Sequence, residues 1–265
     1  MPLPPLRRWS IALAAWLALA APSQALQILT EDWPPFTNAR QGVPEGMIGE
    51  VVQAIQERLD DHTPTTALPW SRGYHLLLQT PNVMLFSVFR TPDREKRFTL
   101  LGPVAIVENI LYARRSSPLT IKRLADAKRV RRITTQRDTG YLETLQRLGF
   151  TNLDVSSNPT DSARKLMTGR VDLWSDSNLS AAYHVQKLGH SPDAIAPKLV
   201  VGRMELYFAF SRGTPAPVIR HWSAALRAMQ QDGTLARIQR KWTPSARTPR
   251  PVGLVGLPPG TPMPD

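Results

Sequence analysis

Few side chains in this sequence are spaced for bond-making chemistry. The chain has no cysteine, which excludes thiol catalysis, thiolate metal sites and disulfides. Its five histidines show no metal-ligand spacing, and it has neither a Gly-rich phosphate loop nor a G-x-S-x-G elbow. Asp172 and Asp176 would share one face of a strand and could form a carboxylate pair. Catalysis is therefore weakly supported, and we expect neither a metal nor a cofactor.

An aromatic corner near the N-terminus is the clearest candidate for a binding surface. The apolar run Leu26–Leu29 leads into Trp33-Pro34-Pro35-Phe36, and an amphipathic helix follows with Ile48, Val51, Val52, Ile55 and Leu59 on one face. Open α/β sheets bind small ligands beyond the carboxyl ends of their strands. An aromatic ring at this place could therefore contact a ligand. The alternative is that Trp33 and Phe36 fill the core.

Helix and strand patterns alternate along the chain, which favours an α/β fold. Val83–Phe89, Ile106–Ala113 and Leu206–Phe210 are predicted strands. Two amphipathic helices are predicted over Val218–Gln230 and Leu235–Trp242. Beyond them, residues 243–265 contain seven prolines and three glycines without helical periodicity, so we expect an extended or disordered tail.

The first residues have the pattern of a secretory signal. Arg7 and Arg8 precede the apolar stretch Ile11–Ala21, and Ser23-Gln24-Ala25 is a small-x-small cleavage site. The alternative is a membrane anchor, but the apolar run is shorter than the roughly 20 residues of a membrane span. We expect cleavage after Ala25 and an exported, soluble product in the periplasm.

The chain is basic, with a net charge of +12 at pH 7. The lysines and arginines are scattered, except for the dense run Lys128–Arg132, and no nucleic-acid-binding motif is present. We interpret the charge as a solvated surface, with attraction of anionic solutes as the alternative. No nucleic-acid partner is expected.

Five motifs in a fixed order resemble those of the family 3 extracellular solute-binding proteins, the amino-acid type of periplasmic binding protein. The first is the aromatic corner with its helix. The others are Pro69-Trp70-Ser71-Arg72, the stretch Ser87–Glu95, the stretch Gly169–Asp176, and Asp232-Gly233-Thr234-Leu235 followed by Ile238 and Lys241-Trp242. The resemblance covers nearly all of residues 26–242.

The resemblance implies a type II, two-lobed α/β fold with two hinge crossings. Residues 1–25 would be the signal, residues 26–106 plus 205–242 lobe 1, residues 107–204 lobe 2, and residues 243–265 the Pro-rich tail. A small polar, carboxylate-bearing (amino-acid-like) solute would bind between the lobes, which would close over it. The protein would be a monomer that delivers its solute to an ABC transporter permease or a membrane sensor.

The resemblance also assigns two charged residues to the ligand. Arg94 matches the family arginine that binds a ligand carboxylate, as suits a guanidinium that pairs bidentately. The alternatives are a surface ion pair with a neighbouring acid or a structural role, and Arg90 could replace Arg94. Asp176 matches the family acid that binds a ligand ammonium. It could instead be the N-cap of a helix predicted over Asn178–Leu188.

Further positions follow from the same resemblance. Trp33 and Trp70 would form aromatic walls, Ser87 would donate to the carboxylate, and Thr139 would bind an anion at a helix start or simply cap that helix. Phe89 departs from the family, since a small hydroxyl residue is common there. This departure weighs against a standard α-amino acid.

Two other functions remain compatible with the sequence. An accessory or signalling protein that has lost its small ligand would fit the departure at Phe89. A dehydratase-like enzyme on the same fold would need a general acid or base, for which Glu50 or Asp176 could serve. Glu50 is otherwise interpreted as a structural or cleft-edge residue.

Overall fold

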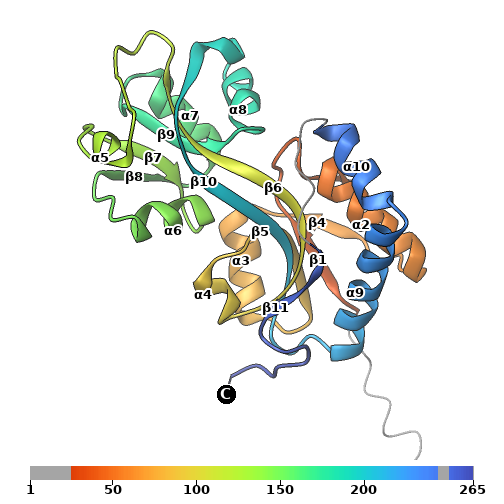
Figure 1. Cartoon of the computed structure of the whole chain (residues 1–265). Coiled ribbons are helices and arrows are strands. Elements are labelled where there is room, and N and C mark those ends of the chain that lie inside the picture. Colours follow the sequence, from red (N-terminus) through yellow and green to blue (C-terminus); the bar gives the residue numbers. More distant parts are fainter. Residues whose placement is uncertain (1–24, 244–250, 265) are drawn as a thin grey trace, which may run out of the picture.

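The computed structural model describes residues 25–243 and 251–264. All but the last residue of the predicted secretory signal lies outside these ranges, as do residues 244–250 of the predicted tail. The described chain forms two α/β lobes that share one sheet (Figure 1). No helix in the described ranges is both long and apolar enough to cross a membrane.

Two long antiparallel strands connect the lobes: β6 (Thr99–Arg114) and β10 (Ile195–Phe210). They cross the middle of the molecule side by side (Figure 1). The strand order β4-β1-β5-β10-β6-β9-β7-β8 places them at the centre of the sheet, with β11 also pairing with β6. The predicted lobe boundaries, after residues 106 and 204, lie within these two strands, and this division of the chain stays our proposal.

We call lobe 1 the part of the molecule that contains the β4-β1-β5 side of the sheet. Its strands are β1 (Gln27–Thr30), β4 (Thr65–Ala67), β5 (Val83–Phe89) and β11 (Gly253–Gly256), with a separate hairpin of β2 (Asn38–Arg40) and β3 (Val43–Glu45). Its helices are α2 (Gly46–Leu59), α3 (Trp70–Gln79), α4 (Pro92–Glu95), α9 (Ala216–Gln231) and α10 (Thr234–Trp242).

Both faces of the lobe 1 sheet are covered. Helices α2, α9 and α10 pack on one face around Val51, Trp222 and Ile238, and α3 packs on the other face through Trp70 and Leu77. Because β5 is covered on both sides, every one of its residues is buried. This explains why its sequence is apolar at every position except Ser87, rather than alternating between apolar and polar residues.

Lobe 2 has the same layered arrangement at the other end of β6 and β10. Its strands are β7 (Ile133–Gln136), β8 (Leu153–Ser156) and β9 (Leu173–Ser177). Its helices are α5 (Leu124–Ala127), α6 (Gly140–Arg147), α7 (Pro159–Met167) and α8 (Ala181–Lys187), followed by the short 3-10 helix η1 (Pro192–Ala194). One core lies between the sheet and α7 and α8, and a second lies under α5 and α6.

The C-terminal segment was predicted to be extended or disordered, and its described part contains an extended strand. Over residues 251–264 the chain is ordered against lobe 1, where β11 pairs antiparallel with Thr99–Gly102 of β6 (Figure 1). The Thr99 hydroxyl donates to the Leu257 carbonyl at 2.8 Å, and the Gln230 side chain accepts from the Val252 N–H at 2.9 Å. Proline-rich composition did not prevent this pairing, because the short run Gly253–Gly256 contains no proline and meets an unpaired strand edge.

Candidate functional site

The carboxyl ends of four strands, two from each lobe, meet around one small cavity. Glu31 follows β1, and Phe89 ends β5 in lobe 1. Gln136 ends β7, and Asp176 lies near the end of β9 in lobe 2. Short polar turns after buried strands therefore bring side chains from distant parts of the sequence to the same place, as open α/β sheets generally do.

Five of the six predicted ligand residues line this cavity: Trp33, Trp70, Ser87, Thr139 and Asp176. The sequence analysis did not select several of the other lining residues, which are Glu31, Gln136, Tyr141, Pro159, Trp174 and Ser175. Phe89, noted above as a departure, lines it too. The cavity volume is about 10 Å³, which is room for about one water molecule. A larger solute could therefore enter only if the lobes moved apart.

Aromatic rings form much of the wall and belong to both lobes. Trp33 packs against Phe36 and Phe89, with ring centroids 4.2 Å and 5.7 Å away, and Phe89 meets Tyr141 of lobe 2 at 4.8 Å. Trp33 is buried and belongs to the lobe 1 core, so the core-filling interpretation and the cavity-wall interpretation both hold for it. Phe36 is buried in that core and does not line the cavity.

Two carboxyl groups face the cavity from opposite lobes. Burial raises the pKa of Asp176 to about 7, although hydrogen bonds from Ser180 and the Ser177 N–H lower it in part. Burial also raises the pKa of Glu31 to about 8; a hydrogen bond with Gln136 lowers it, and the nearby charge of Asp176 raises it. Both groups are therefore partly protonated near neutral pH.

The local structure around Asp176 does not fit a helix N-cap. Helix α8 begins at Ala181, and Ser180 is its N-cap. Asp176 Oδ1 instead accepts from the Ser177 N–H and the Ser180 hydroxyl, each at 2.6 Å. These bonds hold the carboxyl group at the strand end. In contrast, Thr139 does cap α6, since its hydroxyl accepts from the Leu142 N–H at 3.4 Å.

Ser87 has two unusual features at the cavity wall. Its φ of 68° lies in the left-handed region, which is costly for a residue other than glycine, asparagine or aspartate. Its hydroxyl is buried without a hydrogen-bond partner among the described residues. Backbone strain and an unpaired polar atom are typical of sites where a bound molecule completes the bonding.

Arg94 does not line the cavity, although it is fully buried beside it. Its Nη1 donates to the Phe89 carbonyl at 3.1 Å, and its Nη2 donates to the Asp138 carbonyl at 2.8 Å and pairs with Glu143 at 2.9 Å. Its Nε is buried and has no hydrogen-bond partner in the part of the chain that the structure describes. The ligand role of Arg94 stays a prediction, and the structure adds a role in joining the lobes.

A second donor makes the same connection between lobes. The Trp70 indole N–H of lobe 1 donates to the Asp138 carbonyl at 2.7 Å, and the Arg94 guanidinium lies 5.5 Å from the Trp70 ring centroid. We call Trp70, Arg94, Asp138 and Glu143 the interlobe latch. Gly140 permits the close approach, since a Cβ there would lie 2.8 Å from Phe89 Cβ and 2.7 Å from Met204.

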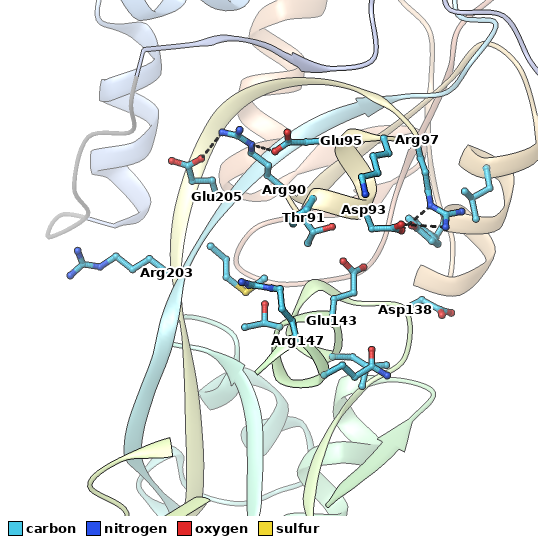
Figure 2. A pocket seen from close by; sticks show the side chains of 18 of the residues that line it. Arg90, Thr91, Asp93, Glu95, Arg97, Asp138, Glu143, Arg147, Arg203 and Glu205 are labelled. Atoms are coloured by element: carbon cyan, nitrogen blue, oxygen red, sulfur yellow. Dashed lines mark hydrogen bonds and ion pairs between the residues drawn. The ribbon is translucent and has the colours of Figure 1, made fainter. Parts of the chain in front are cut away.

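A wider groove of about 1140 Å³ opens beyond the latch, between α4, α6 and the crossing strands (Figure 2). Its acidic and basic groups largely neutralise one another. Figure 2 shows Arg90 between Glu95 and Glu205, and Arg97 paired with Asp93. The smaller cavity is the better candidate site, because the strand ends and the unpaired buried groups point to it rather than to the groove.

Two other candidates lie outside the small cavity. Arg90, the alternative to Arg94, lines the groove and pairs with Glu95 and Glu205. Glu50, considered as an acid or base, lies on α2 and pairs with Lys241 of α10 at 2.6 Å. This contact fits the structural interpretation of Glu50.

Solved structures with the same fold include proteins of different roles. A histidine kinase sensor domain with similarity to periplasmic binding proteins has a TM-score of 0.76 at 22% identity, covering 85% of this chain and 98% of that one. The arginine-, lysine-, histidine-binding protein ArtJ from Geobacillus stearothermophilus has a TM-score of 0.72 at 16% identity, covering 85% of this chain and 97% of that one. The ancestral amino acid-binding protein AncCDT-1, a precursor of cyclohexadienyl dehydratase, has a TM-score of 0.68 at 20% identity, covering 82% of this chain and 94% of that one.

At these identities the structural likenesses establish the fold and no ligand. None of the curated proteins matches the chain in sequence. The family model for bacterial extracellular solute-binding proteins, family 3, matches residues 26–245, which include both lobes apart from β11, the latch and every residue of the candidate site. With its two-lobed fold and a cavity between the lobes, this chain belongs to the family 3 bacterial extracellular solute-binding proteins.

Proposed function

We propose that this protein captures a small polar solute between its lobes in the periplasm and delivers it to an ABC transporter permease, without covalent chemistry. The observation that carries the proposal is the convergence of polar and aromatic side chains from both lobes on one buried cavity. A solute there would contact lobe 1 and lobe 2 together only when they are closed, so its binding would favour closure. The family match supports an exported location.

The expected carboxylate on the solute depended on Arg94. Two nitrogens of Arg94 already bind acceptors of lobe 1 and lobe 2. The structure therefore supports a carboxylate on the solute less strongly than the sequence position of Arg94 did. The charge of the solute is therefore taken up in the next subsection. The monomeric state and the permease partner rest on the family match and stay proposals.

Binding is tested with the chain from Leu26 onward and a panel of amino acids, dicarboxylates, polyamines and aromatic acids. A solute that binds the native state alone stabilises it by about 2.7 kcal/mol at a hundred times its dissociation constant. We expect one chemical class to raise the unfolding midpoint and to reduce the radius of gyration in X-ray scattering. A panel without any stabilising solute would contradict the proposal.

One observation favours a second candidate, an acid–base enzyme. Glu31 and Asp176 lie in a small buried cavity, where burial raises their pKa values to about 8 and about 7, a range that suits proton transfer at neutral pH. The two functions are separated by recovering the solute after long incubation with stoichiometric protein. Recovery of unchanged solute supports binding alone, and conversion that is lost in Asp176→Asn supports the enzyme.

A further inference from the structure

The candidate cavity is acidic, and this property limits what it can hold. Its twelve lining residues include two carboxyl groups, Glu31 and Asp176, and no lysine, arginine or histidine. Five aromatic rings complete much of the wall: Trp33, Trp70, Phe89, Tyr141 and Trp174. Such rings attract cations through the negative faces of their π systems. The lining chemistry therefore matches a positively charged group and offers no counter-ion to a carboxylate.

The two carboxyl groups belong to different lobes. Glu31 follows β1 of lobe 1, and Asp176 lies in β9 of lobe 2. They are close enough for the charge of Asp176 to raise the pKa of Glu31. When both are ionised they repel each other across the cavity, which opposes closure of the lobes. A cation placed between them would remove this repulsion and attract both lobes.

The Asp176 carboxyl group also retains bonding capacity. Asp176 accepts two hydrogen bonds at Oδ1, while Oδ2 accepts none from the described residues.

Other titratable groups also face the two carboxyl groups. The charge of Asp32 raises the pKa of Glu31 and the charge of Arg94 lowers it, and both effects are smaller than that of burial. Tyr112 and Tyr141 lie within the field of Asp176 and are neutral near pH 7, because burial raises the pKa of both phenols.

Among the described residues, the one buried cation near the cavity is Arg94, which is bonded elsewhere. Two nitrogens of Arg94 donate to the Phe89 and Asp138 carbonyls and pair with Glu143. Its guanidinium also lies 5.5 Å and 5.2 Å from the ring centroids of Trp70 and Tyr74, outside the cavity lining. Its Nε is a single donor left unpaired by the described residues, but a solute carboxylate paired with Nη1 and Nη2 would displace contacts that join the lobes, whereas a cation requires no such exchange.

We infer that the solute is an organic cation, an amine or a guanidinium compound without a carboxylate, held between Glu31 of lobe 1 and Asp176 of lobe 2. This inference rests on the proposed function and specifies its ligand class. The positive group would bridge the two carboxylates, and its hydrocarbon part would contact the aromatic walls. Ser87, with its unpaired buried hydroxyl, would be available to a further polar group of the solute.

The test uses matched pairs of compounds that differ only in the carboxylate. Methylamine, tyramine and agmatine are compared with glycine, tyrosine and arginine, so that size and aromatic character vary while each pair isolates one group. Unfolding midpoints of the chain from Leu26 onward are measured at pH 9, above the pKa of about 8 for Glu31 and about 7 for Asp176, so that both carboxylates are largely ionised. We expect at least one amine to raise the midpoint and its parent amino acid to bind at least tenfold more weakly.

Three variants locate the effect. Glu31→Gln and Asp176→Asn keep the shape of each side chain and remove its charge, so the stabilisation by the amine should be lost in both. Glu57→Gln, which changes an exposed carboxylate on α2, should leave it unchanged. The unliganded midpoint of each variant shows whether it folds, and we expect it to stay or rise, since a buried charge has been removed.

Several results would overturn the inference. Parent amino acids that stabilise as strongly as their amines would overturn it and leave the solute-binding function standing. The inference would also be overturned if a dicarboxylate or an aromatic acid were the one class that binds. Amine binding that survives both Glu31→Gln and Asp176→Asn would overturn it as well. Failure of these six compounds and of the wider solute panel would refute the proposed function itself.

Discussion

Replacing Arg94 by alanine distinguishes its observed role in the latch from its predicted role at the ligand. Hydrogen bonds to charged donors contribute about 1.5–3 kcal/mol each, and breaking a buried ion pair costs about 3–5 kcal/mol. Glu143 retains 29% exposure and would be rehydrated, which lowers the cost. We therefore expect Arg94→Ala to reduce the free energy of unfolding of the empty protein by about 3 kcal/mol.

The matched control is Arg97→Ala in the turn that follows α4. Arg97 pairs with Asp93 at 2.8 Å, but their side chains are 50% and 56% exposed. Exposed pairs of this kind contribute about 0–1 kcal/mol. Both free energies are measured by urea unfolding, and X-ray scattering of the empty proteins reports the lobe spacing. Arg94→Ala should increase the radius of gyration, and Arg97→Ala should not.

Two outcomes would refute this account of Arg94. If Arg94→Ala costs less than about 1 kcal/mol and leaves the lobe spacing unchanged, its interlobe contacts do not hold the lobes together. If the same variant also loses all solute binding, the guanidinium is a ligand group, as its sequence position predicted. Arg94→Lys adds a further comparison, because lysine keeps the charge without the planar fork of donors, and we expect an intermediate loss of stability.

Three further perturbations probe the same structure. The pKa values of Glu31 and Asp176 are raised in the folded state, so the native protein holds protons that the unfolded chain releases. The free energy of unfolding of the protein without solute should therefore fall by a few kcal/mol between pH 5 and pH 8. Urea unfolding across this pH range measures the fall. Gly256→Ala, at a φ of 84° with a Cβ that would lie 2.4 Å from the Phe98 carbonyl, should release β11 and speed amide exchange over residues 251–264. Trp70→Phe keeps a ring but removes the N–H donor of the latch, and should cost about 0.5–1.5 kcal/mol in the same unfolding assay.

Continuous apolar runs and amphipathic periodicity predicted much of the fold. The strand over Val83–Phe89 has the predicted bounds because its burial on both faces favours apolar residues, which occupy every position except Ser87. The crossing strands were predicted too short, over Ile106–Ala113 and Leu206–Phe210. Pro103, Pro197 and Gly202 indicate breaks locally, yet the strands continue, with register shifts near Pro197 and Gly202.

Site residues were predictable where a strand end could be located. Asp176 was selected by its match to the family acid, and Val171, Leu173 and Trp174 also indicate a buried strand just before it. Glu31 was missed, although it follows the apolar run Leu26–Leu29 by two positions and the same reasoning would have selected it. The bonding of Arg94 could not be predicted, since its acceptors on lobe 2 are more than forty residues away along the chain.

The sign of the pH dependence of binding reports the charge of the solute before its identity is known. Protons and a cation compete for Glu31 and Asp176, so a cationic solute would release protons on binding and bind more tightly as pH rises through 7 to 8. A carboxylate solute would be repelled by the same two groups once ionised, and would bind more weakly over that range. The empty protein loses stability as pH rises in either case. Affinity and stability that change in opposite directions with pH are therefore expected of a cation held between the lobes, and not of an anion.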